Sequence, residues 1–138
     1  MQFHFNKHKS AVQIKKEIKK TLKQLSKKHI LRIISSAREE GTSKCLKNND
    51  MEKLFSFIYG FESGRLKADK FKLVLENYNI SKDECIFVTD TLGDILEANE
   101  IGIKSIGIIS KYHNKETLMK GKPFKVISEL SELSRIIK

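Results

Sequence analysis

Two aspartates spaced four residues apart are the clearest indication of chemistry in this chain of 138 residues. Asp90 ends the apolar run Ile86–Thr89, and Asp94 follows a turn with Gly93 and opens a helical pattern. In an open α/β sheet, ligands bind in the crevice beyond the carboxyl ends of the strands. Carboxylates at that place can hold a divalent cation, directly or through water. The pair therefore predicts a metal site for a cation such as Mg²⁺.

Three other polar residues are expected at the same edge of the sheet. Ser35 and Ser36 follow the apolar run Ile30–Ile34, and Lys67 precedes a helical pattern. A hydroxyl at the start of a helix can bind a phosphate oxygen, and a lysine can neutralise phosphate. With the two aspartates they predict a phosphate-plus-magnesium site. Each also has a plainer interpretation: Ser36 as a helix cap, Lys67 as a surface lysine, and Asp94 as a helix residue that the dipole favours.

The elements that must position these residues alternate between strand and helix. Apolar runs predict strands over 30–34, 55–59, 85–89, 103–109 and 124–127, and helical patterns cover 11–28, 36–46, 68–78, 93–101, 115–120 and 128–137. Gly102 is a natural carboxyl-terminal cap for the fourth of these helices. The alternation predicts an α/β fold, a three-layer sandwich with a mostly parallel sheet and helices on both faces.

The positive charge of the chain is concentrated near its amino terminus. The net charge is +10, and residues 1–47 account for all of it with 13 Lys and Arg against 3 Asp and Glu. Most of the lysines fall on a helix predicted over 11–28, whose apolar face carries Ile14, Ile18, Leu22 and Leu25. We interpret this segment as one basic amphipathic helix with a solvated face. Binding of an acidic partner or nucleic acid stays as an alternative, although no aromatic residues interleave to stack on bases.

Composition indicates a soluble protein of one domain. Hydrophobic residues make up 39% and charged residues 32% of the chain. No apolar run approaches the roughly 20 residues that span a bilayer, and the first residues do not resemble a signal peptide. Cys45 and Cys85 match no metal or redox spacing, so we expect two thiols in a reducing cytoplasm. We divide the domain into a leader (1–10), the basic helix (11–28) and an α/β core (30–138).

From about residue 11 to 133 the chain resembles the haloacid dehalogenase-like (HAD) phosphohydrolases, in particular the phosphoglycolate phosphatase-like branch. Ile33–Ala37 resembles the second motif of that family, with Ser36 the preferred register and Ser35 the alternative. Gly64–Asp69 resembles the third motif, whose lysine would be Lys67, and Phe87–Gly107 resembles the fourth. The resemblance implies a Rossmann-like fold, Mg²⁺ at Asp90 and Asp94, and phosphate bound by the serines and Lys67. Thr89 stands where the family usually has glycine.

The same resemblance implies a part that this chain lacks. The family's first motif is a central strand followed by Asp-x-Asp, and its first aspartate is the nucleophile. No Asp-x-Asp occurs in the sequence, and the cap region that many members carry is also missing. We therefore expect a partial core domain without the usual central first strand. The position could be filled by Gln2–Phe5, by a partner chain, or by direct pairing of the neighbouring strands.

The leading hypothesis is a HAD-like phosphatase core that has lost its nucleophile and is inactive alone, as a truncated, split or degenerate enzyme. Expected partners are a phosphorylated small molecule, and a second copy or complementing chain at the unpaired sheet edges. The alternative hypothesis is a non-catalytic module that binds phosphate or nucleic acid. A receiver-like or flavodoxin-like domain fits the size, but receivers place their acidic pair after the first strand.

Overall fold

The computed structural model of the chain describes residues 2–5, 15–35, 38–59 and 67–137. They form a sheet of six strands in the order β3-β2-β1-β4-β5-β6, and all of its pairings are parallel. The strands are β1 (Gln2–Phe5), β2 (Ile30–Ile34), β3 (Phe55–Tyr59), β4 (Cys85–Thr89), β5 (Lys104–Ile108) and β6 (Lys125–Ile127). The predicted α/β class and parallel sheet are confirmed.

Six α-helices connect the strands in the described part of the chain. They are α1 (Lys16–Ser26), α2 (Glu39–Asn48), α3 (Lys67–Asn77), α4 (Leu92–Ile101), α5 (Lys115–Met119) and α6 (Leu133–Ile136). Short 3-10 turns lie at Glu52–Leu54, Lys82–Glu84 and Leu130–Glu132. Helix α4 ends at Gly102 with φ of 86°, the left-handed cap that the sequence predicts.

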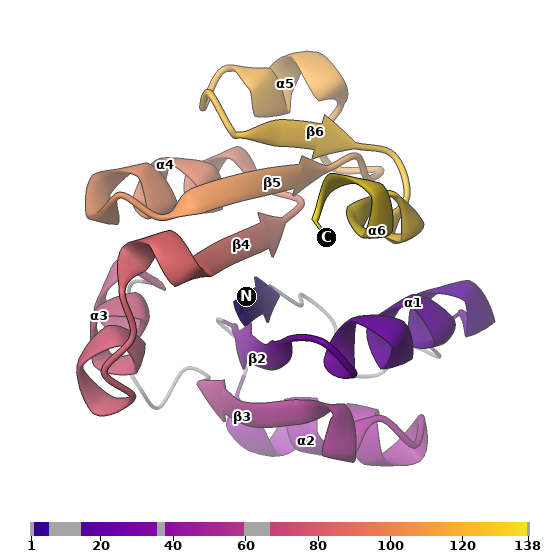
Figure 1. The fold of residues 1–138 in the computed structure, drawn as a ribbon. Helices are drawn as coiled ribbons and strands as arrows, with labels where there is room; N and C mark the ends of the chain where they lie inside the picture. Colours follow the sequence, from indigo (N-terminus) through magenta and orange to yellow (C-terminus); the bar gives the residue numbers. More distant parts are fainter. Residues whose placement is uncertain (1, 6–14, 36–37, 60–66, 138) are drawn as a thin grey trace.

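The helices cover both faces of the sheet and give three layers (Figure 1). Helices α1, α2 and α6 pack on one face, where Leu22, Leu46 and Leu133 join strand residues such as Val88 in one apolar core. Helices α3 and α4 pack on the other face, around Phe71, Phe87 and Ala98. Strands β2 and β4 are nearly continuous apolar runs because helices bury them on both faces.

The central strand is the main correction to the sequence-based expectation. Strand β1 lies between β2 and β4, with Phe5 in register with Ile33 on one side and Val88 on the other. The sheet therefore has its central first strand, and the residues that supply it are Gln2–Phe5, the first of the three alternatives. These four residues belong to the sheet, although the sequence analysis assigned them to a leader.

Candidate functional site

The site is built at the carboxyl ends of the three central strands. In a parallel sheet these ends lie at one edge, so the residues that directly follow β2 and β4 lie at that edge, on either side of β1. Asp90 directly follows β4, and Ser35 directly follows β2. Helix α3 begins with Lys67, the position expected for the third-motif lysine. The side chain of Lys67, and the whole of Ser36, lie outside the described residues.

Asp94 is held by two neighbouring threonines. It is the third residue of α4 and only 5% exposed. The Thr89 hydroxyl donates to Asp94 Oδ2 at 2.7 Å. The backbone N–H of Asp94 donates to Thr91 Oγ1 at 3.3 Å, which makes Thr91 the amino-terminal cap of α4. The Thr89 hydroxyl and the Thr91 cap thus hold the Asp94 carboxylate at the crevice. These contacts add to the effect of the helix dipole, which was the plainer interpretation of Asp94.

The start of α4 is also joined to the loop after β5. The backbone N–H of Leu92 donates to His113 Nδ1 at 3.4 Å, and His113 is half-buried. His113 therefore connects the loop after β5 to the helix that carries Asp94.

The two aspartates fit a divalent cation as part of its donor set. Asp94 has one carboxylate oxygen bound by Thr89, and half-buried Asp90 lies at the end of the preceding strand. Mg²⁺ in proteins takes one or two carboxylates and completes its shell with water and phosphate oxygens. Within the described ranges, no group of three or more His, Cys, Asp or Glu side chains gathers around a common point. The donor chemistry therefore suits a cation bound together with phosphate rather than a closed protein cage.

Lys70 is a residue of this edge that the sequence analysis missed. Its side chain is fully buried, and Nζ donates to the Ser35 carbonyl at 2.5 Å. Next to it, Phe71 meets Phe87 of β4 edge to face, with ring centroids 4.7 Å apart. The spacing along the helix could have predicted this burial, because Lys70 is one turn before the buried Val74 and lies on the same side of α3.

The order of the strands also changes the interpretation of residues 6–8. Because β1 is the central strand, the sequence positions that follow it are those where the first-motif Asp-x-Asp would be expected. The residues there are Asn6, Lys7 and His8. Their structure lies outside the described residues, so their assignment rests on sequence position alone. The alternating pattern Gln2–Phe5 was the signal that could have located them.

A cavity at the same edge of the sheet does not coincide with these residues. It has a volume of about 470 Å³ and lies between the amino end of α1 and the ends of β5 and β6. Its lining includes Lys15, Thr21, Ile108 and Ser128. The lining contains neither aspartate of the pair, so this cavity is separate from the candidate site.

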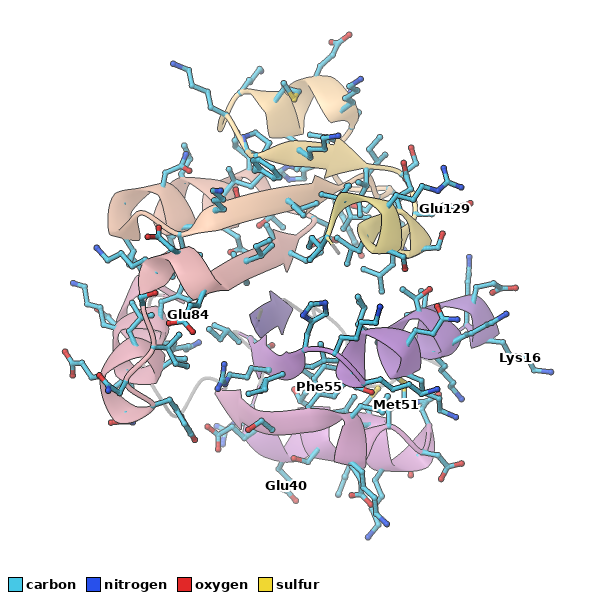
Figure 2. All side chains as sticks on the ribbon, viewed as in Figure 1. Lys16, Glu40, Met51, Phe55, Glu84 and Glu129 are labelled. Atoms are coloured by element: carbon cyan, nitrogen blue, oxygen red, sulfur yellow. The ribbon has the colours of Figure 1, made fainter. Side chains whose placement is uncertain are left out.

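The basic helix presents its charges to solvent. Thr21, Leu22 and Leu25 are buried against the core, while Lys16, Lys20, Lys23, Lys27 and Lys28 are exposed. Figure 2 shows Lys16 extending from the amino end of α1 away from the sheet. This is the amphipathic arrangement that the sequence predicts. None of the helices in the described ranges combines the length and apolarity that crossing a membrane requires.

The chain is similar to a known protein family and to curated proteins. The model of the haloacid dehalogenase-like hydrolase family matches residues 2–108. A curated relative from Caldanaerobacter subterraneus, named as the pyrophosphatase PpaX, is 27% identical over 135 residues, which are 95% of this chain and 61% of that protein. A phosphoglycolate phosphatase from Photorhabdus laumondii is 26% identical over 121 residues, 85% of this chain and 52% of the relative.

Solved structures agree with the fold. A haloacid dehalogenase-like hydrolase from Streptococcus pneumoniae superimposes with a TM-score of 0.84 at 24% identity, over 91% of this chain and 60% of that one. A phosphatase structure from Clostridium difficile gives a TM-score of 0.82 at 28% identity, with the same coverage of both chains. The chain thus spans between half and two thirds of the length of the proteins it matches. With its family match, sheet order and paired aspartates, the chain belongs to the haloacid dehalogenase-like hydrolase family.

Proposed function

We propose that this chain is a HAD phosphatase core that binds phosphate and Mg²⁺ but does not hydrolyse phosphate esters. The observation that carries the proposal is the central position of β1, followed in the sequence by Asn6-Lys7-His8 instead of Asp-x-Asp. In the family reaction, an aspartate oxygen attacks phosphorus, the ester P–O bond breaks and the alcohol leaves. The resulting aspartyl phosphate is then hydrolysed by water.

An asparagine at the first position does not perform this step. Its neutral carboxamide has no anionic oxygen to form the acyl phosphate, so the chemical step has no nucleophile. Loss of a nucleophile typically lowers the rate by several orders of magnitude, because the remaining groups only bind and position. The groups that bind remain in this sequence: Asp90 and Asp94 for the cation, and Ser35, Ser36 and Lys67 for phosphate.

The ligand that we propose is a small phosphorylated compound. The two curated relatives are named as a pyrophosphatase and a phosphoglycolate phosphatase, and phosphate is the group that these names share. Mg²⁺, when bound, would screen the charge of the phosphate oxygens. Asp90 and the buried Asp94 would hold it, and Thr89 would keep Asp94 oriented. We also propose a cytoplasmic location, supported by two buried cysteines that form no disulfide.

The test restores the missing carboxylates. The purified chain should release no product above a buffer blank from p-nitrophenyl phosphate with Mg²⁺. The double variant N6D/H8D should show Mg²⁺-dependent turnover that is lost again when Asp90→Ala is added. The matched control is N6Q/H8N, which changes the same two positions without adding a carboxylate. Mg²⁺-dependent turnover by the unaltered chain, abolished by Asp90→Ala, would contradict the proposal.

A second candidate function is binding of a polyanion by the exposed lysines of α1. Lys16, Lys20 and Lys23 are exposed, whereas Leu22 and Leu25 of the same helix are buried in the core. Such a surface attracts nucleic acid through its phosphates, without reading sequence. This function is compatible with the first, because α1 is separate from Asp90 and Asp94, and it is tested by one of the predictions below.

A further inference from the structure

The amino edge of the sheet, opposite the candidate site, carries a second pocket. This amino-edge pocket has a volume of about 320 Å³ and is lined by residues that include Gly102, Lys104, Ser105 and Lys122. It lies where α4 ends and where β5 and β6 begin. Figure 1 shows the starts of β4, β5 and β6 on one side of the sheet, away from their arrowheads. Strand β4 has five residues of about 3.3 Å each, so this edge lies about 16 Å from Asp90.

The amino-edge pocket is positively charged. Lys104 and Lys122 line it, and none of the described residues that line it carries a carboxylate. A third lysine is close, because a Cβ built on Gly102 would lie 4.0 Å from Lys82 Nζ. The three lysines lie at the starts of β4, β5 and β6 or just before them, so the strand order brings them together. This charge favours an anion that carries more than one negative charge.

The hydroxyl of Ser105 is a buried donor that has no hydrogen-bond partner in the described part of the chain. Ser105 is 1% exposed and lines the amino-edge pocket. A Cβ on Gly107, two residues further along β5, would meet Ile95 of α4 and Leu118 of α5. Because side chains alternate along a strand, Ser105 faces the same two helices, on the side of the pocket. Buried hydroxyls are nearly always satisfied, and an anion in the pocket would supply an acceptor.

The backbone of Lys122 has the left-handed conformation, with φ of 54°. This conformation is uncommon for a lysine and costs free energy, whereas a glycine adopts it readily. Asn99 Nδ2 holds the preceding residue by donating to the Gly121 carbonyl at 2.6 Å. On the other side, the N–H of Phe124 donates to the Ser105 carbonyl at 2.8 Å. The turn is thus held on both sides, and its geometry does not require a lysine.

From these observations we propose that the amino-edge pocket binds the phosphate group of a small phosphorylated compound, at a site separate from the two aspartates. A phosphate monoester carries close to two negative charges at pH 7 and offers three acceptor oxygens. Lys104 and Lys122 would supply the opposite charge, and the Ser105 hydroxyl would donate to one oxygen. The half-exposed ring of Phe124 also lines the pocket and would pack against the organic part of the compound. This inference does not rest on the proposed function, because the two sites share no residue.

The experiment titrates inorganic phosphate into the isotope-labelled chain without Mg²⁺, at constant ionic strength, and follows the chemical shifts of backbone amides. The amides of Gly102 and Gly121 report on the amino-edge pocket, and that of Gly93 reports on the crevice near the aspartates. Lys122→Gly removes one charge and relieves the left-handed backbone, so it should unfold at the same temperature as the unaltered chain or at a higher one. Ser105→Ala removes the hydroxyl alone.

We expect saturable shifts at the pocket amides. Lys122→Gly should weaken phosphate binding by about threefold, within the range for one exposed ion pair. Ser105→Ala should weaken it by about tenfold, as for a hydrogen bond to a charged group. The matched control, Lys115→Gln, removes an exposed lysine of α5 outside the lining and should change the affinity by less than about 1.5-fold. Equal affinities of Ser105→Ala and the unaltered chain would overturn the inference, and so would shifts confined to Gly93 or no saturable shift at Gly102.

Discussion

The hydroxyl of Thr89 donates to the carboxylate of Asp94 across the turn that joins β4 to α4, with 2.7 Å between Oγ1 and Oδ2. Both side chains are buried, at 1% and 5% exposure. Thr89 is also the position where the sequence departs from the glycine usual in the family. The substitution thus adds a donor that orients one of the two proposed metal ligands.

Thr89→Val tests the importance of this donor. Valine keeps the shape and removes the hydroxyl, so Asp94 loses its buried hydrogen bond. We expect the free energy of unfolding to fall by about 1.5–3 kcal/mol, the range for a hydrogen bond to a charged group, as measured by urea denaturation. Affinity for Mg²⁺, followed by calorimetry, should fall as well. The control is Thr117→Val in the half-exposed helix α5, expected to change stability by less than about 0.5 kcal/mol. Equal free energies of unfolding for Thr89→Val and Thr117→Val would contradict the role of the Thr89 hydroxyl.

Two glycines near the start of α4 should respond oppositely to alanine. A Cβ on Gly121 would lie 2.6 Å from Ile95 Cγ2 and 3.0 Å from Leu92 Cδ1, whereas a Cβ on Gly93 meets nothing within 4 Å. Gly121→Ala should destabilise the fold by about 1–3 kcal/mol through overpacking. Gly93→Ala, inside the first turn of α4, should be neutral or stabilise by up to about 1 kcal/mol. The denaturant midpoints of the two variants, measured in parallel, check both expectations. A loss of stability in Gly93→Ala as large as that in Gly121→Ala would be inconsistent with this packing.

The thiol of Cys85 should make stability depend on pH in the alkaline range. Burial raises its pKa from 9.0 to about 11, and the nearby Arg32 guanidinium only partly opposes this. Between these two values the unfolded chain has released the thiol proton while the folded chain still holds it. The free energy of unfolding contributed by Cys85 is therefore present below about pH 9 and is lost as pH rises toward 11.

The measurement compares urea denaturation of the unaltered chain and Cys85→Val across the same pH range. Other groups titrate in both proteins, so the difference between the two curves isolates the thiol. We expect the unfolding free energy of the unaltered chain to fall relative to that of Cys85→Val as the pH rises from about 9 to about 11. A difference that is constant with pH would mean that the folded and unfolded thiols titrate alike.

Neutralising the lysines of α1 should affect polyanion binding without affecting the fold. Lys16, Lys20 and Lys23 are exposed, so their triple change to Gln should alter the free energy of unfolding by less than about 0.5 kcal/mol per site. Binding of single-stranded DNA should weaken, and the slope of its dependence on salt should fall by about one for each lysine that contacts phosphate.

The control for charge alone changes to Gln three exposed lysines at positions 115, 120 and 125, which lie in α5, directly after it, and in β6. This variant has the same net charge as the triple variant of α1. Equal weakening by the two would show that net charge, and not the surface of α1, attracts the polyanion.

Most of the scaffold could be predicted because its signals are local. Strands 30–34, 55–59 and 85–89 have the bounds that their apolar runs predict. The first and last of these are buried on both faces, and such strands show continuous apolar runs. The end of α4 follows from Gly102, which adopts the left-handed conformation.

The features that were missed depend on contacts between distant residues. Strand β1 has four residues, two of them polar, and only its neighbours β2 and β4 make it a central strand. Lys70 resembles any surface lysine until the fold brings Ser35 to it. The donor role of Thr89 depends on the turn that returns Asp94 to it, so the sequence alone shows only that position 89 departs from the glycine usual in the family.

The central place of β1 also has a consequence for how the chain folds. Phe3 is paired with Ile86, 83 residues further along the sequence, so β1 is enclosed in the sheet only after β4 exists. Pairings this distant are slow to form, because the entropy cost of closing the intervening loop comes before any favourable contact between the strands. Strand β2 and the basic helix precede β4 in the sequence. They can therefore form long before β1 has a neighbouring strand on both sides. A ribosome-bound chain that ends before β4 would therefore expose one side of β1.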